Sequence, residues 1–389
     1  MKPRVLLLDI DGVLVAPLGY RAAVQAALAH TFRRWGWPLA PPDDLAEHYE
    51  AAGISSEWHM VPLALATALD AWSSTTSQVP SPAVLEPTGP SPGPWQGTKP
   101  DFAATPRRLA PHLTPNASPG ETAWRLQGTP QAIFPSLGRS PLAQTLLTRT
   151  REPLIAPTTR LFQHFALGSA TFARTYGRPA EIQTPSFLKQ YDRALLPPVF
   201  AEWLCEARAQ QRLFTAVFSA RPSLPPRGTP PRVGYAPEAE MALEAIGCPN
   251  LPLIAFGRLQ ALAEEIGLPS ADALLKPAPF HALAALLAAL TGDEHQALRA
   301  AAAWQANQRH AKDILPTEGV HIIVVEDTTS GMQAALALQH RLREEGVPIE
   351  LTLLGVATHP AKRRSLARLG AHLFPTTEDA FASLTENLA

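Results

Sequence analysis

The sequence is poor in cysteine, in long apolar runs and in net charge. Its two cysteines, Cys205 and Cys248, lie far apart in the chain and outside any CxxC motif. This argues against a disulfide framework and against a thiolate zinc site, and it fits a reducing cytosol. No apolar run approaches a membrane span, and Asp9 and Asp11 break the N-terminal run too early for a signal peptide. The net charge of −1 gives no reason to expect nucleic-acid or membrane binding, so we expect a soluble, cytoplasmic protein.

Several common catalytic motifs are also missing. The sequence contains no GxxxxGK[ST] or GxGxxG loop, so nothing in it argues for a nucleotide-binding loop. HExxH and GxSxG are absent as well, which leaves no sequence argument for a zinc protease or a serine hydrolase elbow. The glycosylation sequon at 116–118 has no secretory context and is discounted.

Proline, in contrast, is abundant, with 41 residues, about twice the usual share of ~5%. Many of these prolines lie in residues 73–160, where Ser and Thr are also dense. Helix and sheet interiors do not tolerate that composition, so we expect this stretch to be mostly irregular or disordered. Its slight excess of basic residues allows two interpretations, a solvated linker or a docking surface for a protein partner.

From residue 213 onward, apolar strands alternate with helices. The pattern predicts strands at 213–219, 251–257, 321–327, 349–358 and 372–376, in addition to an opening strand that ends near Asp9. Earlier in the chain, helices are expected at 20–36, 43–53 and 55–72. Strands of continuous Val, Ile, Leu and Phe separated by helices indicate an α/β fold with a parallel sheet covered on both faces. In such folds the chemistry lies at the carboxyl ends of the strands.

Polar residues follow three of these strands. The first ends at Asp9 and Asp11, which share one face of a strand and therefore repel each other unless a metal ion, a proton or solvent offsets the cost. Taken alone, this could be a strand end with two solvated carboxylates. However, the other two strand ends and a nearby helix start add a hydroxyl, two carboxylates and an amine: Ser219, Glu326, Asp327 and Lys276. Together these groups are able to hold Mg²⁺ and a phosphate.

The order of these motifs resembles that of the haloacid dehalogenase-like (HAD) superfamily, within it the phosphatases and phosphomutases with a helical cap. The matching stretches are DIDGVL at 9–14, the serine of VFSARP, the lysine of KPAP and VVEDTTSGMQAA at 324–335. The resemblance covers about residues 1–17 and 212–380. It implies a Rossmann-like core formed by 1–17 and 210–389, with a mostly α-helical cap inserted at 18–209.

The resemblance also implies roles for four residues. Asp9 would be the nucleophile that forms an aspartyl-phosphate. Asp11 would protonate the leaving oxygen and then activate water. Ser219 would hold the phosphoryl oxygens, and Lys276 would neutralise charge and orient Asp9. The acid at position 11 favours phosphoryl transfer over dehalogenation, because an alkoxide is a poor leaving group.

A magnesium site is implied at the same place. Asp327 would bind Mg²⁺ together with the Asp9 carboxylate and the main-chain carbonyl of Asp11, and Glu326 would act through a metal-bound water. Gly12 would allow the chain to turn away from the site. The expected function is that of a Mg²⁺-dependent phosphatase, a hydrolase acting on a small phosphorylated metabolite. A phosphomutase using the same site, or an interaction module working through the proline-rich segment, are the alternatives.

Two further places allow a functional and a structural interpretation. Glu57, Trp58 and His59 stand at an expected helix start in the insertion, where they face a substrate or pack within the cap. Arg221 follows Ser219 by two residues, and it is either a substrate contact or a surface arginine.

Overall fold

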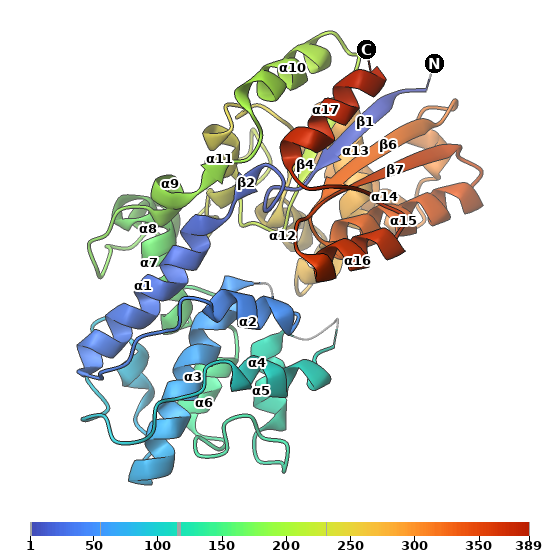
Figure 1. Cartoon of the computed structure of the whole chain (residues 1–389). Coiled ribbons are helices and arrows are strands. Elements are labelled where there is room, and N and C mark those ends of the chain that lie inside the picture. The colour runs from blue at the N-terminus through green and yellow to red at the C-terminus, as the bar shows by residue number, and fades with distance from the viewer. Residues whose placement is uncertain (1, 55, 115–117, 231, 389) are drawn as a thin grey trace. The chain divides into compact units, whose positions relative to one another are not determined.

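The computed structural model describes residues 2–54, 56–114, 118–230 and 232–388 and divides into two compact units (Figure 1). The first, here called the sheet unit, contains Met1–Pro17 and Asp192–Ala389, and the second, the helical unit, contains Leu18–Tyr191. The structure therefore corrects the expected boundary, because residues 192–209 belong with the sheet and not with the insertion. The apolar face of α10 (Pro198–Ala209) explains this, since Ala201, Leu204 and Ala207 are buried in the core of the sheet unit.

The sheet unit is built on a six-stranded sheet with the order β5-β4-β1-β6-β7-β8, and all five strand pairs are parallel. The strands are β1 (Arg4–Leu8), β4 (Phe214–Phe218), β5 (Leu253–Ile254), β6 (Val320–Glu326), β7 (Ile349–Val356) and β8 (His372–Phe374). The predicted parallel α/β fold is confirmed. The chain runs outward from β1 through β4 to β5 and then returns to the other side of β1. Such a reversal of strand order is the point at which open parallel sheets bind their ligands, outside the carboxyl ends of the strands.

Helices cover both faces of the sheet, as the alternation within β1 requires. Val5 and Leu7 point into one core, formed with α12 (Phe256–Ile266), α13 (Pro279–Thr291), α14 (Glu294–Gln305) and α15 (Thr329–Glu344). Leu6 and Leu8 point into the other core, formed with α10, α11 (Glu238–Ala245) and α17 (Thr377–Leu388). The remaining helix, α16 (Pro360–Arg368), packs on β7 and β8, and a short antiparallel pair joins β2 (Val15–Ala16) to β3 (Arg193–Ala194).

The described residues of the helical unit form helices and no strand. Its elements are α1 (Leu18–Trp35), α2 (Leu45–Ala51), α3 (Glu57–Thr76), α4 (Ala104–Leu109), α5 (Pro119–Leu126), α6 (Pro141–Leu147), α7 (Pro157–Leu167), α8 (Ser169–Tyr176) and α9 (Phe187–Tyr191). Helix α1 packs against α3, α7 and α9, and α3 packs in turn against α6 and α7. None of the helices described in either unit is both long and apolar enough to cross a membrane.

The described residues of the proline-rich segment, 73–114 and 118–160, form short helices joined by irregular connections, where the sequence analysis expected a mostly irregular or disordered stretch. Three short helices within it begin with the same Ser-Pro pair, at 81–82, 118–119 and 140–141. In each pair the serine side chain accepts a hydrogen bond from a backbone N–H of the first turn, and the proline occupies a position whose N–H has no partner within the helix. The serines and prolines thus mark helix starts. The connections between them remain irregular.

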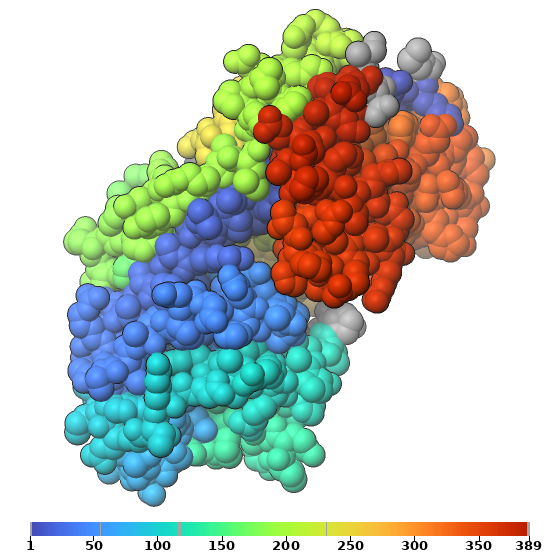
Figure 2. Space-filling model, viewed as in Figure 1, coloured from blue at the N-terminus to red at the C-terminus, as the bar shows by residue number. Residues whose placement is uncertain are grey.

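Three tryptophan side chains anchor an irregular part of the proline-rich segment by hydrogen bonds. Trp35, Trp37 and Trp72 each donate a hydrogen bond from Nε1 to a carbonyl of the segment, at 3.1, 2.8 and 2.9 Å from Val84, Gly93 and Pro94. The three rings pack together with Trp95. Figure 2 shows the cyan residues of this segment lying against the blue residues of the same unit. The buried indoles fix a backbone that has few hydrogen bonds of its own.

Candidate active site

The carboxyl ends of three adjacent strands carry the residues that the sequence singled out. Asp9 follows β1, Ser219 follows β4, and Glu326 ends β6 before Asp327. In the register of the sheet, Leu8 pairs with Val217 on one side and with Val325 on the other. The three strands therefore end at the same level, and the side chains that follow them share one edge.

Lys276 lies at the centre of this edge. Its Nζ is 2.8 Å from Asp9 Oδ1 and 2.7 Å from Glu326 Oε1, and its side chain is 5% exposed. Burial alone would lower the pKa of Lys276, but the charges and hydrogen bonds of Asp9 and Glu326 outweigh it and raise the pKa. The amine therefore remains protonated and joins two buried carboxylates.

His281 fixes the backbone of Lys276, and the sequence analysis did not identify it. Its Nδ1 accepts a hydrogen bond from the Lys276 N–H at 3.1 Å, and its Nε2 is 2.8 Å from the Ile254 carbonyl oxygen. Burial lowers the pKa of His281 to about 3, so the ring is neutral, with Nε2 as the donor. A histidine in the first turn of an apolar helix carries no sequence signal of this function.

Asp9, Glu326 and Asp327 form an acidic cluster. One carboxylate oxygen of each lies within 4.8 Å of the others. Burial and the charge of Asp9 raise the pKa of Glu326 to about 8. Burial also raises the pKa of Asp327 to about 6, although Lys362 on α16, 2.7 Å from Oδ2, opposes this. The raised pKa values reflect chiefly the burial of these two carboxylates, to which the charge of Asp9 adds.

Two glycines allow this close approach. A Cβ at Gly12, where φ is +75°, would lie 2.4 Å from Asp327 Oδ2. A Cβ at Gly331 would lie 1.7 Å from Glu326 Oε1. Thr328 completes the surroundings of Glu326, because its hydroxyl donates to Oε2 at 3.1 Å. Both positions require glycine because a carboxylate occupies the space of a side chain.

Asp11 belongs to a second ion-pair group at the same edge. Arg221 donates from Nε and Nη2 to Asp11 Oδ1 at 2.9 and 2.6 Å, and from Nη2 to Asp192 Oδ2 at 3.1 Å. Arg221 is 2% exposed, so the alternative of a surface arginine is wrong. Its backbone N–H also donates to Ser219 Oγ at 3.3 Å, which links Ser219 to this group. Asp192 lies at the start of the second chain segment of the sheet unit and has no motif around it, so sequence reasoning missed it.

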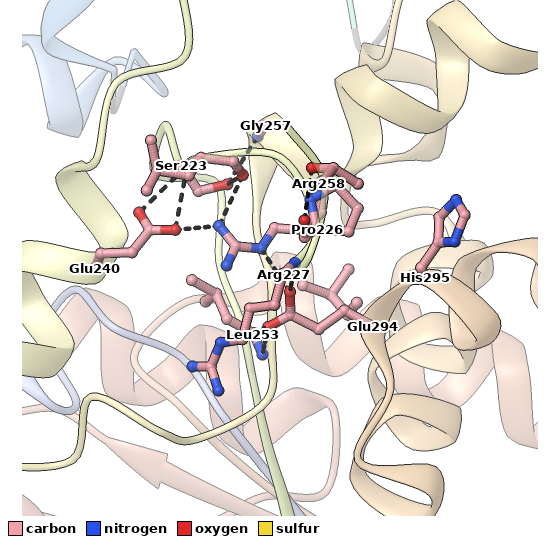
Figure 3. Close-up of polar contacts among 12 residues, drawn as sticks. Ser223, Pro226, Arg227, Glu240, Leu253, Gly257, Arg258, Glu294 and His295 are labelled. Carbon is pink, nitrogen blue, oxygen red and sulfur yellow. Dashed lines mark hydrogen bonds and ion pairs between the residues drawn. The ribbon is translucent and has the colours of Figure 1, made fainter. Parts of the chain in front are cut away.

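The loop that carries Ser219 and Arg221 is anchored by a buried ion-pair network (Figure 3). Arg258 forms ion pairs with Glu240 and with Glu294, and it donates to the Leu224 carbonyl at 2.7 Å. Glu294 accepts from the Arg227 N–H at 3.0 Å, and the Ser223 hydroxyl accepts from a backbone N–H of α12 at 3.0 Å. The loop after β4 is therefore held at several points by buried side chains.

Glu57, Trp58 and His59 were the candidate substrate contacts in the helical unit, and the structure shows what Trp58 and His59 contact within that unit. His59 is buried, its Nδ1 is 2.8 Å from the Thr150 hydroxyl, and burial lowers its pKa to about 3. The ring of Trp58 meets the ring of Phe162 edge-on at 6.3 Å. Glu57 begins α3 as the acidic residue of its first turn. Trp58 and His59 therefore pack within the helical unit.

Together the ion pairs at the sheet edge join five carboxylates to three cations: Asp9, Asp11, Asp192, Glu326 and Asp327 with Lys276, Arg221 and Lys362. When all eight are ionised, two negative charges remain, which matches the charge of one divalent cation. The acidic cluster offers oxygen atoms only, as Mg²⁺ prefers. The residues present therefore fit such an ion.

No family model matches the sequence, and no curated protein is similar to it. Two solved structures are similar in fold. A crystal structure determined as a structural-genomics target is 15% identical, with a TM-score of 0.63, over 100% of this chain and 99% of that chain. A phosphatase from Thermococcus thioreducens is 13% identical, with a TM-score of 0.43, over 94% of this chain and 99% of that chain. The first likeness establishes a shared α/β fold, and neither one bears on the chemistry.

Proposed function

We propose that the chain is a HAD-like, Mg²⁺-dependent phosphatase that hydrolyses a small phosphorylated metabolite through an aspartyl-phosphate, an acyl phosphate formed on Asp9. The observation that carries the proposal is the bridge of Lys276 between Asp9 and Glu326, with Asp327 in the same cluster. A buried carboxylate held by a lysine at the end of a central strand is placed to attack a phosphorus atom from a fixed direction.

Asp9 attacks with a carboxylate oxygen, and Asp11 gives a proton to the leaving alcohol oxygen as the P–O bond breaks. Water then attacks the phosphorus of the aspartyl-phosphate while Asp11 takes one of its protons, and inorganic phosphate leaves. Arg221 fixes the position of Asp11 by a two-nitrogen contact. The Ser219 hydroxyl donates to a phosphoryl oxygen.

Lys276 has two functions in this scheme. It holds the attacking carboxylate at 2.8 Å and places positive charge beside the phosphoryl group. Glu326 positions Lys276, because its carboxylate oxygens accept hydrogen bonds from the Lys276 amine and from the Thr328 hydroxyl. When bound, Mg²⁺ would be held by Asp9, Asp327 and the main-chain carbonyl of Asp11, and it would supply positive charge to the phosphoryl oxygens.

The test compares wild-type protein with Asp9→Asn in the release of phosphate from a generic phosphomonoester, with and without Mg²⁺. We expect release by the wild type that depends on Mg²⁺, and loss of at least about a thousandfold in the variant. The matched control is Asp43→Asn, at an exposed position of the helical unit. Turnover by the folded Asp9→Asn variant at the wild-type rate would overturn the mechanism. A sugar phosphate as substrate, with product analysis, separates hydrolysis from a mutase reaction.

A further inference from the structure

The two cysteines of the chain lie side by side, although 43 residues separate them in sequence. Cys205 Sγ is 3.8 Å from Cys248 Sγ. Cys205 lies on α10 and is exposed, whereas Cys248 follows α11 and is 2% exposed. Sequence spacing gave no sign of this pairing, because the fold of α10 onto the sheet unit creates it.

We propose that Cys205 and Cys248 are an oxidation site, at which a peroxide converts the two thiols to an intrachain disulfide. The Cys205 thiol loses its proton, and the thiolate attacks one oxygen of the peroxide. The O–O bond breaks, which leaves a sulfenic acid and a hydroxide, and the hydroxide takes up the proton of the thiol to give water. The Cys248 sulfur then attacks the Cys205 sulfur. The S–S bond forms as the S–O bond breaks, and the hydroxide leaves with the Cys248 proton as a second water.

Exposure sets the order of these steps. Cys205 is the sulfur that a dissolved oxidant can reach, and Cys248 waits beneath it. Burial and the neighbouring Cys205 raise the pKa of Cys248 to about 12, so it remains a thiol and does not react first. Its closeness to Cys205 offsets the weak nucleophilicity, because the second step is intramolecular. The sulfurs need to approach from 3.8 Å to about 2.05 Å for the bond to form.

The cross-link would join two parts of the sheet unit that already meet through hydrogen bonds. Arg208 of α10 donates to the Asn250 carbonyl at 3.0 Å, two residues beyond Cys248. From the other side, Arg227 donates to the carbonyls of Pro249 and Asn250 at 2.8 and 3.1 Å. A disulfide there closes a long loop, which lowers the conformational entropy of the unfolded chain. It also links α10 covalently to the connection before β5.

The experiment treats the full chain with one equivalent of hydrogen peroxide and then blocks free thiols with iodoacetamide. We expect an intact mass lower by two hydrogens, no alkylation, and a proteolytic fragment that joins residues 205 and 248 until dithiothreitol is added. We also expect the thermal unfolding midpoint of the oxidised protein to rise by about 5 °C. These measurements on wild-type protein require no variant to fold.

Two variants separate the steps. Cys248→Ser should stop at the sulfenic acid, which dimedone traps at Cys205, and Cys205→Ser should leave Cys248 slow to alkylate. The proposal is overturned if peroxide leaves both thiols open to alkylation, if it adds oxygen without a cross-link, or if the disulfide forms between two chains. Phosphatase assays play no part in these readouts, so the outcome is independent of the proposed function.

Discussion

Replacing Lys276 by methionine tests whether the carboxylates at the sheet edge form one buried charge cluster. The amine lies 2.8 Å from Asp9 and 2.7 Å from Glu326, and both carboxylates are buried. Methionine keeps most of the length of the side chain and removes the charge. Loss of one partner from a buried ion pair costs about 3–5 kcal/mol, because the remaining charge is left without compensation. We expect the free energy of unfolding of the sheet unit to fall by about that amount in metal-free buffer at alkaline pH.

The loss of stability in Lys276→Met should grow as the pH rises. The pKa of Glu326 in the folded protein is about 8, above the ordinary value of 4.5. Between these two values the folded state binds more protons than the unfolded state, so stability falls as pH rises. Without Lys276 the pKa of Glu326 rises further, and the fall extends to higher pH. The difference in stability between variant and wild type is therefore small near pH 5 and largest above about pH 8.

The measurement is urea unfolding followed by circular dichroism, in EDTA, at about pH 5.5 and about pH 8.5. Lys312→Met, at an exposed position of the same unit, is the matched control, and we expect its stability to change by less than about 0.5 kcal/mol. An unchanged unfolding midpoint for Lys276→Met at the higher pH would refute the reasoning. So would a loss of equal size at both pH values, because it would point to packing and not to charge.

Three further substitutions test other parts of the fold. Gly331→Ala places a Cβ 1.7 Å from Glu326 Oε1; we expect a loss of about 1–3 kcal/mol in urea unfolding and an at least tenfold lower kcat. Arg258→Met leaves Glu294, 2% exposed, without its buried partner; we expect about 3 kcal/mol lower stability and a lower kcat, since the loop after β4 loosens. Trp72→Phe removes the indole N–H that donates to the Pro94 carbonyl of the proline-rich segment; we expect the free energy of unfolding of the helical unit to fall by about 1 kcal/mol.

The sequence could predict which residues meet at this sheet edge because they lie at the ends of apolar strands. Asp9, Ser219, Glu326 and Asp327 each follow a run of Val, Leu, Ile or Phe, and parallel strands bring their carboxyl ends to one edge. Lys276 was predicted from its place at a helix start near these strand ends, and the resemblance added its role; the structure brings its amine to Asp9 and Glu326.

Other members of the site carry no local signal. Lys362 lies in the basic run AKRR, which reads as a solvated helix face, yet its amine is 2.7 Å from Asp327. Asp192 and His281 have no motif around them. Asp192 gains its partner Arg221 only when two segments of the fold meet, and so does His281 with the Ile254 carbonyl, although its bond to Lys276 is local. The pairing of Arg221 with Asp11 spans 210 residues of chain.

Composition predicted a mostly irregular or disordered proline-rich segment, but it does not show where in a helix each proline stands. Prolines exclude helix interiors, but at the first turn of a helix after a serine they are favourable. The order of part of the segment also depends on three indoles, from α1, from α3 and from Trp37 just after α1, which no local pattern indicates. With the segment packed into the helical unit, its length no longer motivates a separate interaction module.

The sequence by itself determined the parallel α/β fold, the strand ends with polar residues, the helices that alternate with the strands, and the first three helices of the helical unit, because hydrophobic periodicity is a local property of the chain. Only the tertiary structure decided which charges face each other, where the two units divide, and that two distant cysteines lie 3.8 Å apart. The physical reason is that ion pairs and thiol contacts depend on distances between segments far apart in sequence. Those distances are set by the packing of the two cores.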